Sequence, residues 1–335
     1  MVTSIVAVAS VTVLKDGRVL IAGGIGDNNV TLASAELFDP RTDSFSATGA
    51  LSTARWNHAA TLLADGRVLI VGGEDARGAD LSSAELYDPA TGKFTPTGSM
   101  PGPRAGPSST LLADGRVLVV GGDFGTTLNP RASAEIFDPA TGQFSPTGSM
   151  LAAADKSAAT RLMDGRVLFT GGSDDHLTNV SSAELYDPST GHFTMTGTMT
   201  DDRVDHAVAL LADGQVLVVG GIDNTGHVVG SAEVYDPATG KFTATRSMVQ
   251  AREFHTATLL ADGRVLVVGG DEGHSGLASS ELYDPTTGRF TPTGSMPAPR
   301  DGISAARLPD GRVMFVGGSD FGANAASPWV YLYNP

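Results

Sequence analysis

The tetrapeptide Asp-Gly-Arg/Gln-Val recurs along the chain, and this repetition constrains the fold more than any other feature of the sequence. Its copies begin at Asp16, Asp65, Asp114, Asp164, Asp213, Asp262 and Asp310. Their spacing is about 49 residues, and periods on the order of 20–50 residues are typical of solenoids, propellers and arrays. The repeat overrides the two or three domains that a length of 335 residues would suggest. We therefore expect a single domain over residues 1–335.

Each repeat predicts four antiparallel strands, as the second repeat illustrates. Apolar runs at residues 62–63 and 68–71 flank Asp65-Gly66, which is a typical hairpin pattern because glycine adopts the positive φ of a tight turn. Residues 84–87 alternate as a third strand, and a proline-glycine turn leads to a fourth, outer strand at residues 94–97. No segment keeps an uninterrupted helical period, so we expect an all-β protein with essentially no helix.

The repeat resembles a kelch repeat in its glycine pair after an apolar strand, its Glu-x-Tyr-Asp-Pro segment and a later aromatic residue. Kelch repeats usually carry Trp at that last position, whereas this chain has Phe45, Phe94, Phe144, Phe193, Phe242 and Phe290. The resemblance covers essentially the whole chain and implies a seven-bladed β-propeller of bacterial, galactose-oxidase-like kelch repeats. An open solenoid is the structural alternative. The near-identity of the repeats suggests recent amplification or consensus design.

The two ends of the sequence bear on how the last blade is completed. Residues 330–335 match a third strand, and the Phe-containing fourth strand of that repeat is missing. We expect Met1–Val6, which is extended and β-branched, to add as the outer strand of the last blade and cover its edge. A three-stranded last blade is the alternative.

Residues that recur in every repeat are interpreted as scaffold, because one chemical site cannot use seven copies. The third strand carries a glutamate that we expect to accept backbone N–H hydrogen bonds, at Glu36, Glu85, Glu135, Glu184, Glu233 and Glu281. The Asp-Gly turns and glycine pairs are structural for the same reason.

The connections from fourth to first strand and from second to third strand differ among repeats and should emerge on one face of the propeller. Loops on a rigid scaffold often carry function. Arginine and histidine precede several first strands, and aromatic side chains there could stack on a saccharide or anchor a protein partner. The candidate ligand-binding residues at the channel mouth are Arg55, Trp56, His58, Phe124, Arg203, Asp205, His206, Arg252, Phe254, His255 and Phe321. The structural alternative pairs these arginines with the acidic residues that follow the glycine pairs.

Charge and cysteine content exclude several function classes. The formal charge of −15 would repel nucleic acids and anionic membranes. No apolar run reaches the roughly 18 residues that span a bilayer, so we expect a soluble protein; its compartment is unknown, and a secreted bacterial protein with its leader removed is one interpretation. Cysteine is absent, which excludes the Tyr–Cys cofactor of kelch copper radical oxidases. The Glu-x3-Asp-x3-His motif of iron-binding kelch proteins and a local two-histidine zinc motif are also missing, so we expect no cofactor and no metal.

These observations favour a non-catalytic binding or scaffold propeller that presents its variable loop face to a protein or carbohydrate, as a monomer. No catalytic residue is predicted, and the sequence leaves enzymatic activity open. One alternative is a metal-free carbohydrate-active enzyme similar to the kelch sialic-acid mutarotases. The other is an engineered or amplified propeller without a ligand.

Overall fold

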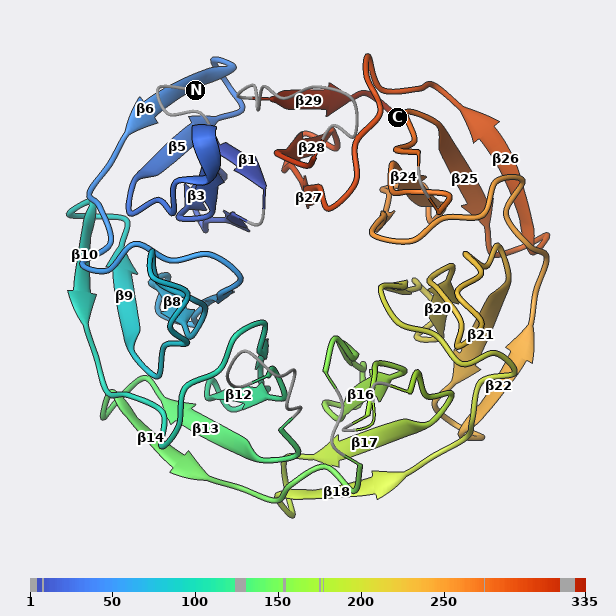
Figure 1. The fold of residues 1–335 in the computed structure, drawn as a ribbon, viewed down its shortest axis with the longest axis horizontal. Coiled ribbons are helices and arrows are strands. Elements are labelled where there is room, and N and C mark those ends of the chain that lie inside the picture. The colour runs from blue at the N-terminus through green and yellow to red at the C-terminus, as the bar shows by residue number, and fades with distance from the viewer. Residues whose placement is uncertain are drawn as a thin grey trace. The chain divides into compact units, whose positions relative to one another are not determined.

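The computed structural model describes residues 5–7 (backbone only), 9–123, 131–152, 155–174, 176, 178–273, 275–319 and 329–335. The chain is a seven-bladed β-propeller whose blades are antiparallel meanders of consecutive strands (Figure 1). Within the described residues the helical content is limited to the 3-10 turn η1, Asp27–Asn29. The predicted all-β class is therefore confirmed.

Two compact units divide the chain, and each is described by itself. The first comprises Met1–Thr147, Ser304–Gly318 and Ala323–Pro335 and contains blades one, two, three and seven. Its strands are β1 (Ile5–Ala7), β2 (Ser10–Val13), β3 (Val19–Ala22), β4 (Ile25–Gly26), β5 (Ala35–Asp39), β6 (Ser44–Ala47), β7 (Ala59–Leu62), β8 (Val68–Val71), β9 (Ala84–Asp88), β10 (Lys93–Pro96), β11 (Ser108–Leu111), β12 (Val117–Val120), β13 (Ala134–Asp138), β14 (Gln143–Pro146), β27 (Ser304–Arg307), β28 (Val313–Val316) and β29 (Val330–Tyr333).

The second unit comprises Gly148–Ile303 and Ser319–Gly322 and contains blades four, five and six. Its strands are β15 (Ala158–Arg161), β16 (Val167–Thr170), β17 (Ala183–Asp187), β18 (His192–Met195), β19 (Ala207–Leu210), β20 (Val216–Val219), β21 (Ala232–Asp236), β22 (Lys241–Ala244), β23 (Thr256–Leu259), β24 (Val265–Val268), β25 (Ser280–Asp284) and β26 (Arg289–Thr293). The prediction of a single domain over residues 1–335 stays a prediction.

The prediction for the chain start is wrong in the part that the structure describes. Strand β1 pairs with β4 of the same unit, at Ile5 opposite Gly26, and does not add to the last blade. Blade seven is the three-stranded sheet β27-β28-β29. Residues 1–4 lie outside the described residues, so the remainder of the predicted closing strand is not placed.

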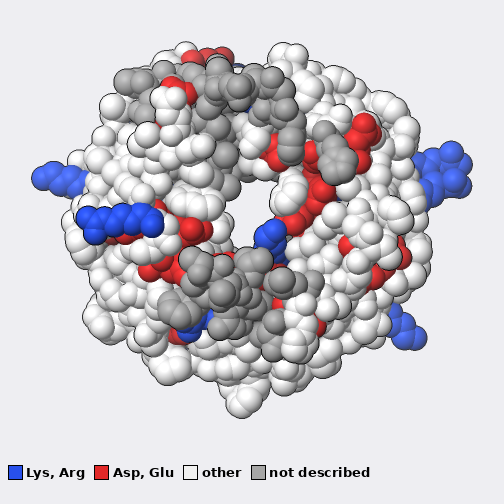
Figure 2. All heavy atoms as spheres, in the orientation of Figure 1, with Lys and Arg blue, Asp and Glu red and all other residues white. Residues whose placement is uncertain are grey.

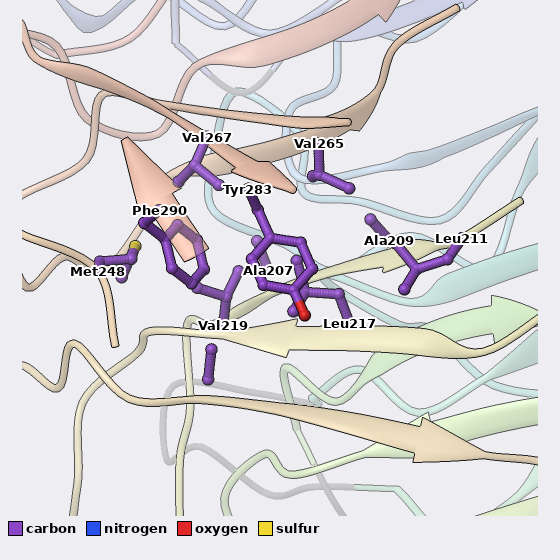
Figure 3. Close-up of a cluster of buried hydrophobic side chains, with 11 residues drawn as sticks. Ala207, Ala209, Leu211, Leu217, Val219, Met248, Val265, Val267, Tyr283 and Phe290 are labelled. Atoms are coloured by element: carbon purple, nitrogen blue, oxygen red, sulfur yellow. The ribbon is translucent and has the colours of Figure 1, made fainter. Parts of the chain in front are cut away.

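The core lies between neighbouring blades. Every residue of the second strand of each blade is buried, as in β20 with its Val-Leu-Val-Val sequence. Between blades five and six, for example, Leu217 and Val219 of β20 pack with Val265 and Val267 of β24 and with Tyr283 (Figure 3). A strand covered on both faces needs apolar residues at successive positions, which explains the continuous apolar runs in the sequence. This packing fixes the loops at the ends of the strands.

No helix among the described residues is both long enough and apolar enough to cross a membrane.

Candidate functional site

The arginines before the first strands are buried and paired with the glutamate of the third strand in the same blade. Arg55 and Arg252 are both 0% exposed. Nη2 of Arg55 lies 3.1 Å from Oε1 of Glu85, and Nη2 of Arg252 lies 3.0 Å from Oε1 of Glu281. The pairs Arg104–Glu135 and Arg203–Glu233 repeat this contact at 2.7 Å and 3.2 Å. Charge-assisted pairs of this kind satisfy both ions only when the remaining donors are also bonded.

The Nη1 groups of these side chains are bonded to the blade itself, whereas their Nε atoms are buried without a hydrogen-bond partner in the described structure. Nη1 of Arg55 donates to the carbonyl oxygens of Gly72 at 2.9 Å and Ser83 at 3.1 Å. The carboxylate of Glu85 accepts the backbone N–H of Ser52 at 2.8 Å, as the sequence predicted for this glutamate. The predicted pairing with acids after the glycine pairs is therefore wrong for these arginines. Because their guanidinium groups are enclosed, we assign Arg55, Arg203 and Arg252 to the scaffold instead of to ligand contact.

The three predicted histidines are packed against glycines of the preceding blade. A Cβ added to Gly171 would lie 2.8 Å from Cε1 of His206, so only glycine fits beneath that ring. Nε2 of His58 shares a hydrogen bond of 3.0 Å with Ser10 Oγ, and His206 does so with Thr170 Oγ1 at 2.9 Å.

Burial and the neighbouring arginines lower the pKa of His58 and of His206 to about 3. The same causes hold the pKa of His255, which is 7% exposed, well below its usual value. These histidines are neutral and structural.

The connection into the first strand of blades two to seven contains a residue with positive φ, which we call the apex residue. The apex residues of the described blades are Asn57, Gly106, Lys156, Asp205, Phe254 and Gly302. In the second unit the N–H of Phe254 donates to the carbonyl of Asp205 at 3.0 Å, and the N–H of Gly302 donates to that of Phe254 at 2.9 Å. Within the second unit, Asp205, Phe254 and Gly302 are thus successive neighbours in space, yet their side chains differ in charge and size.

Lys156, Asp205 and Phe254 form one contact group. Nζ of Lys156 lies 3.2 Å from Oδ2 of Asp205 and 5.5 Å from the ring centroid of Phe254. A bulky side chain at positive φ is uncommon, and Phe254 has a φ of 52° with its ring 38% exposed. Such strain, of order 1–3 kcal/mol, tends to cluster at ligand sites.

Glu253 lies beside this group and has a raised pKa. It is 8% exposed, and no hydrogen bond from a described residue reaches its carboxylate. Burial, followed by the charges of Asp205 and Asp271, raises the pKa of Glu253 to about 7, although Lys156 acts in the opposite direction. Asp301 adds to the increase. Glu253 therefore exchanges a proton near neutral pH.

The carboxylates around Glu253 differ from one another in their hydrogen bonds. Asp271 forms reciprocal backbone hydrogen bonds with Glu253, at 3.0 Å and 2.9 Å, and its Oδ1 accepts the N–H groups of Gly273 and Ser275. Oδ1 of Asp301 is enclosed without a hydrogen-bond partner in the described structure, and burial raises the pKa of Asp301. Burial also raises the pKa of Asp205. Acidic side chains are seen gathered over blades five and six in Figure 2.

Glu253 lines a cleft of about 790 Å³ between the second-to-third-strand loops of blades five and six. The other lining residues include Ile222, His227, Val228, Glu272 and Ser275. This volume falls within the roughly 300–1,000 Å³ that is typical of small-molecule sites. Glu272 is held by Gln250, whose Nε2 donates to Oε2 at 2.7 Å. Glu253 is thus a buried acid that borders a space of substrate size.

Two of the predicted candidates, Asp205 and Phe254, belong to this site in the second unit. Trp56 lies in the first unit, where its backbone pairs with that of Glu74. Phe124 and Phe321 lie outside the described residues. The sequence prediction missed Glu253 and Lys156. Glu253 occupies a position that holds Trp, Ala, Asp, Val or Asp in the other described blades, so an alignment of the repeats could have found it.

Comparison with solved structures finds a fungal alcohol oxidase of the AA5 family in complex with copper, with a TM-score of 0.81 and 22% sequence identity. The match covers 99% of this chain and 74% of the oxidase chain. None of the curated proteins matches the chain. At this identity the likeness shows the fold alone.

The oxidase comparison contradicts the interpretation as a non-catalytic binding or scaffold propeller, because the matched propeller is an enzyme. Copper itself does not fit the residues present. The chain has no cysteine, and over the described ranges no three His, Asp or Glu side chains are placed to hold a metal ion.

The kelch motif matches four segments, residues 55–101, 104–151, 203–249 and 255–297. Each segment begins near the buried arginine or histidine of a blade and ends after its outer strand. Because these segments make up more than half of the sequence, the chain belongs to the kelch-repeat family.

Proposed function

We propose that this chain is a metal-independent enzyme that transfers protons to and from a small-molecule substrate, with Glu253 as its general acid–base residue. The observation that carries the proposal is the position of this carboxyl group. It is buried, it borders a cleft of about 790 Å³, and its pKa is raised to about 7. A general acid–base group works best when its pKa lies near the working pH, and such groups contribute typically 10²–10⁴-fold to a rate.

The neighbouring residues have separate roles in this proposal. Asp205 and Asp271 keep the proton on Glu253 up to neutral pH by charge repulsion, while Lys156 limits that effect. Ile222 and Val228 form an apolar wall of the cleft, which would exclude water around a bound substrate. The arrangement supports reactions that require one proton donor or acceptor, such as enolisation, elimination or hydrolysis.

The test is a turnover screen against small-molecule substrates of these reaction classes, in the presence of a metal chelator. The proposal expects a pH–rate profile with an apparent pKa near 7 and a loss of about 10²–10⁴-fold in Glu253→Gln. Glu74→Gln is the matched control, because burial also raises the pKa of Glu74 but this residue belongs to the first unit. Turnover that survives in Glu253→Gln, or that disappears with the chelator, would contradict the proposal.

A monomeric state, a lack of affinity for nucleic acids and membranes, and a secreted location also remain proposals. The negative charge of the chain supports the second of these. Light scattering, binding assays and cell fractionation would test them.

A further inference from the structure

Negative charge surrounds Glu253, which lines the cleft in the second unit. Asp205, Asp271 and Asp301 all act on Glu253, whereas Lys156 is the cation that acts on it. Glu272 lines the same cleft. The acidic groups alone would not define a ligand. What points to one is Glu253, which is more than nine-tenths buried, receives no hydrogen bond from a described residue and lines the cleft.

The chain itself shows which kind of cation suits this place. The Lys156 ammonium lies 3.2 Å from Oδ2 of Asp205 and 5.5 Å from the Phe254 ring centroid, so a carboxylate and an aromatic face bind one ammonium together. Lys156 is 49% exposed at its side chain and comes from the blade-four apex. The side of Glu253 that faces the cleft is left for a cation from solution.

The cleft suits an organic cation better than a metal ion. Its volume of about 790 Å³ greatly exceeds what an ion needs, and Ile222 and Val228 offer apolar contacts for methylene groups. Across the described part of the chain no three potential ligands are placed to hold a metal.

We propose that the cleft between blades five and six binds a small organic molecule through a primary ammonium group, which Glu253 recognises as its ion-pair partner. This inference rests on the proposed function, since it names the substrate class of the same site. Glu272 offers a second carboxylate in the cleft, so a molecule with two ammonium groups can occupy both ends.

The binding should depend on pH through Glu253. The charged groups that face it are Asp205, Asp271, Asp301 and Lys156, and the cleft adds Glu272 and His227. An ammonium binds the ionised carboxylate, so affinity should rise by up to about tenfold between pH 6 and pH 8, where a group with pKa near 7 loses its proton. The ammonium group of an alkylamine stays charged over this range.

The experiment is calorimetric titration of the full chain with 1,4-diaminobutane and with its neutral isostere 1,4-butanediol, at constant ionic strength and with chelator. The diamine should bind at least about tenfold more tightly than the diol. Glu253→Gln should weaken diamine binding about tenfold, and Lys156→Met should strengthen it, because the Lys156 ammonium acts on Glu253 with the same charge as the ligand. Lys241→Met, on outer strand β22, is the matched control and should change nothing.

His227 is another titratable group of the cleft, and His227→Gln removes it. The rise in diamine affinity with pH should persist in this variant, because Glu253 causes the rise. Equal binding of diamine and diol, or equal effects of Lys156→Met and Lys241→Met, would overturn the ammonium site. If Glu253 titrates near pH 7 but the chain does not bind the diamine, the ammonium site is contradicted and the proposed function is not. Diamine binding together with an ordinary Glu253 pKa would contradict the proposed function alone.

Discussion

Arg252 and Glu253 are neighbours in sequence, both are buried, and they have opposite electrostatic surroundings. Arg252 is 0% exposed and forms a 3.0 Å ion pair with Glu281, as the equivalent arginines of other blades do with theirs. Glu253 is 8% exposed, is surrounded by carboxylates and has a raised pKa. A buried charge that recurs with its partner is scaffold, whereas a buried charge without a hydrogen-bond partner among the described residues indicates a site.

The largest expected effect comes from breaking a scaffold pair. Glu281→Ala leaves the guanidinium of Arg252 buried without a carboxylate, so we expect a loss of about 3–5 kcal/mol in the free energy of unfolding, measured by denaturant titration. The double variant Arg252→Met/Glu281→Leu should recover most of this loss, because no uncompensated charge remains. A small effect of Glu281→Ala would show that the pair is not the scaffold element described above.

The next largest loss of stability is expected where His255 packs against blade five. Gly220 has a φ of +68°, and a Cβ there would lie 2.5 Å from Cε1 of His255. Gly220→Ala should therefore destabilise the protein by about 2–3 kcal/mol. Gly226 has a φ of +80° with open space around it, so Gly226→Ala is the control and should cost about 1 kcal/mol. Equal thermal unfolding of the two variants would argue against the close contact.

Glu253→Gln should stabilise the folded protein, in contrast to Glu281→Ala and Gly220→Ala. This gain should be seen only at higher pH. The pKa of Glu253 rises from 4.5 in the unfolded chain to about 7 in the folded protein. Folding is therefore not penalised below pH 4.5, and the penalty develops as the pH rises from 4.5 to 7 and then stays constant. We expect Glu253→Gln to gain about 1–3 kcal/mol relative to wild type between pH 4 and pH 8, in denaturant titrations. A difference that does not vary with pH would contradict this.

The smallest effect concerns the strained aromatic beside Glu253. Phe254 has a φ of 52°, and the equivalent residue of blade two is Asn57, also at 52°. Asparagine tolerates this conformation better, so Phe254→Asn should stabilise the fold by about 0.5–1 kcal/mol. Calorimetric melting checks this effect, and a lower melting temperature would indicate that the ring is a packing element instead.

The fold could be predicted from the sequence because its determinants are local and repeated. The Asp-Gly hairpins, the apolar second strands and the glycine pairs each specify the same blade many times over. The position of residues 5–7 was overlooked, although the bridge between Ala7 and Ile25 has counterparts in the other blades, such as Trp56 with Glu74 and Glu253 with Asp271.

The site was harder to predict because it depends on contacts between loops of different blades. Arginines and histidines before the first strands suggested ligand contact, but the structure shows these arginines and His255 buried. Glu253 stood between two of those candidates and was overlooked. Its significance arises from Asp205 and Asp271, which approach it only in the folded protein.

The most direct test of this account is a carboxyl ¹³C NMR titration of the full chain labelled at glutamate, with Glu253 assigned by comparison with Glu253→Gln. The account predicts that the Glu253 carboxyl titrates with a midpoint near pH 7. A midpoint in the ordinary glutamate range near 4.3 would contradict it.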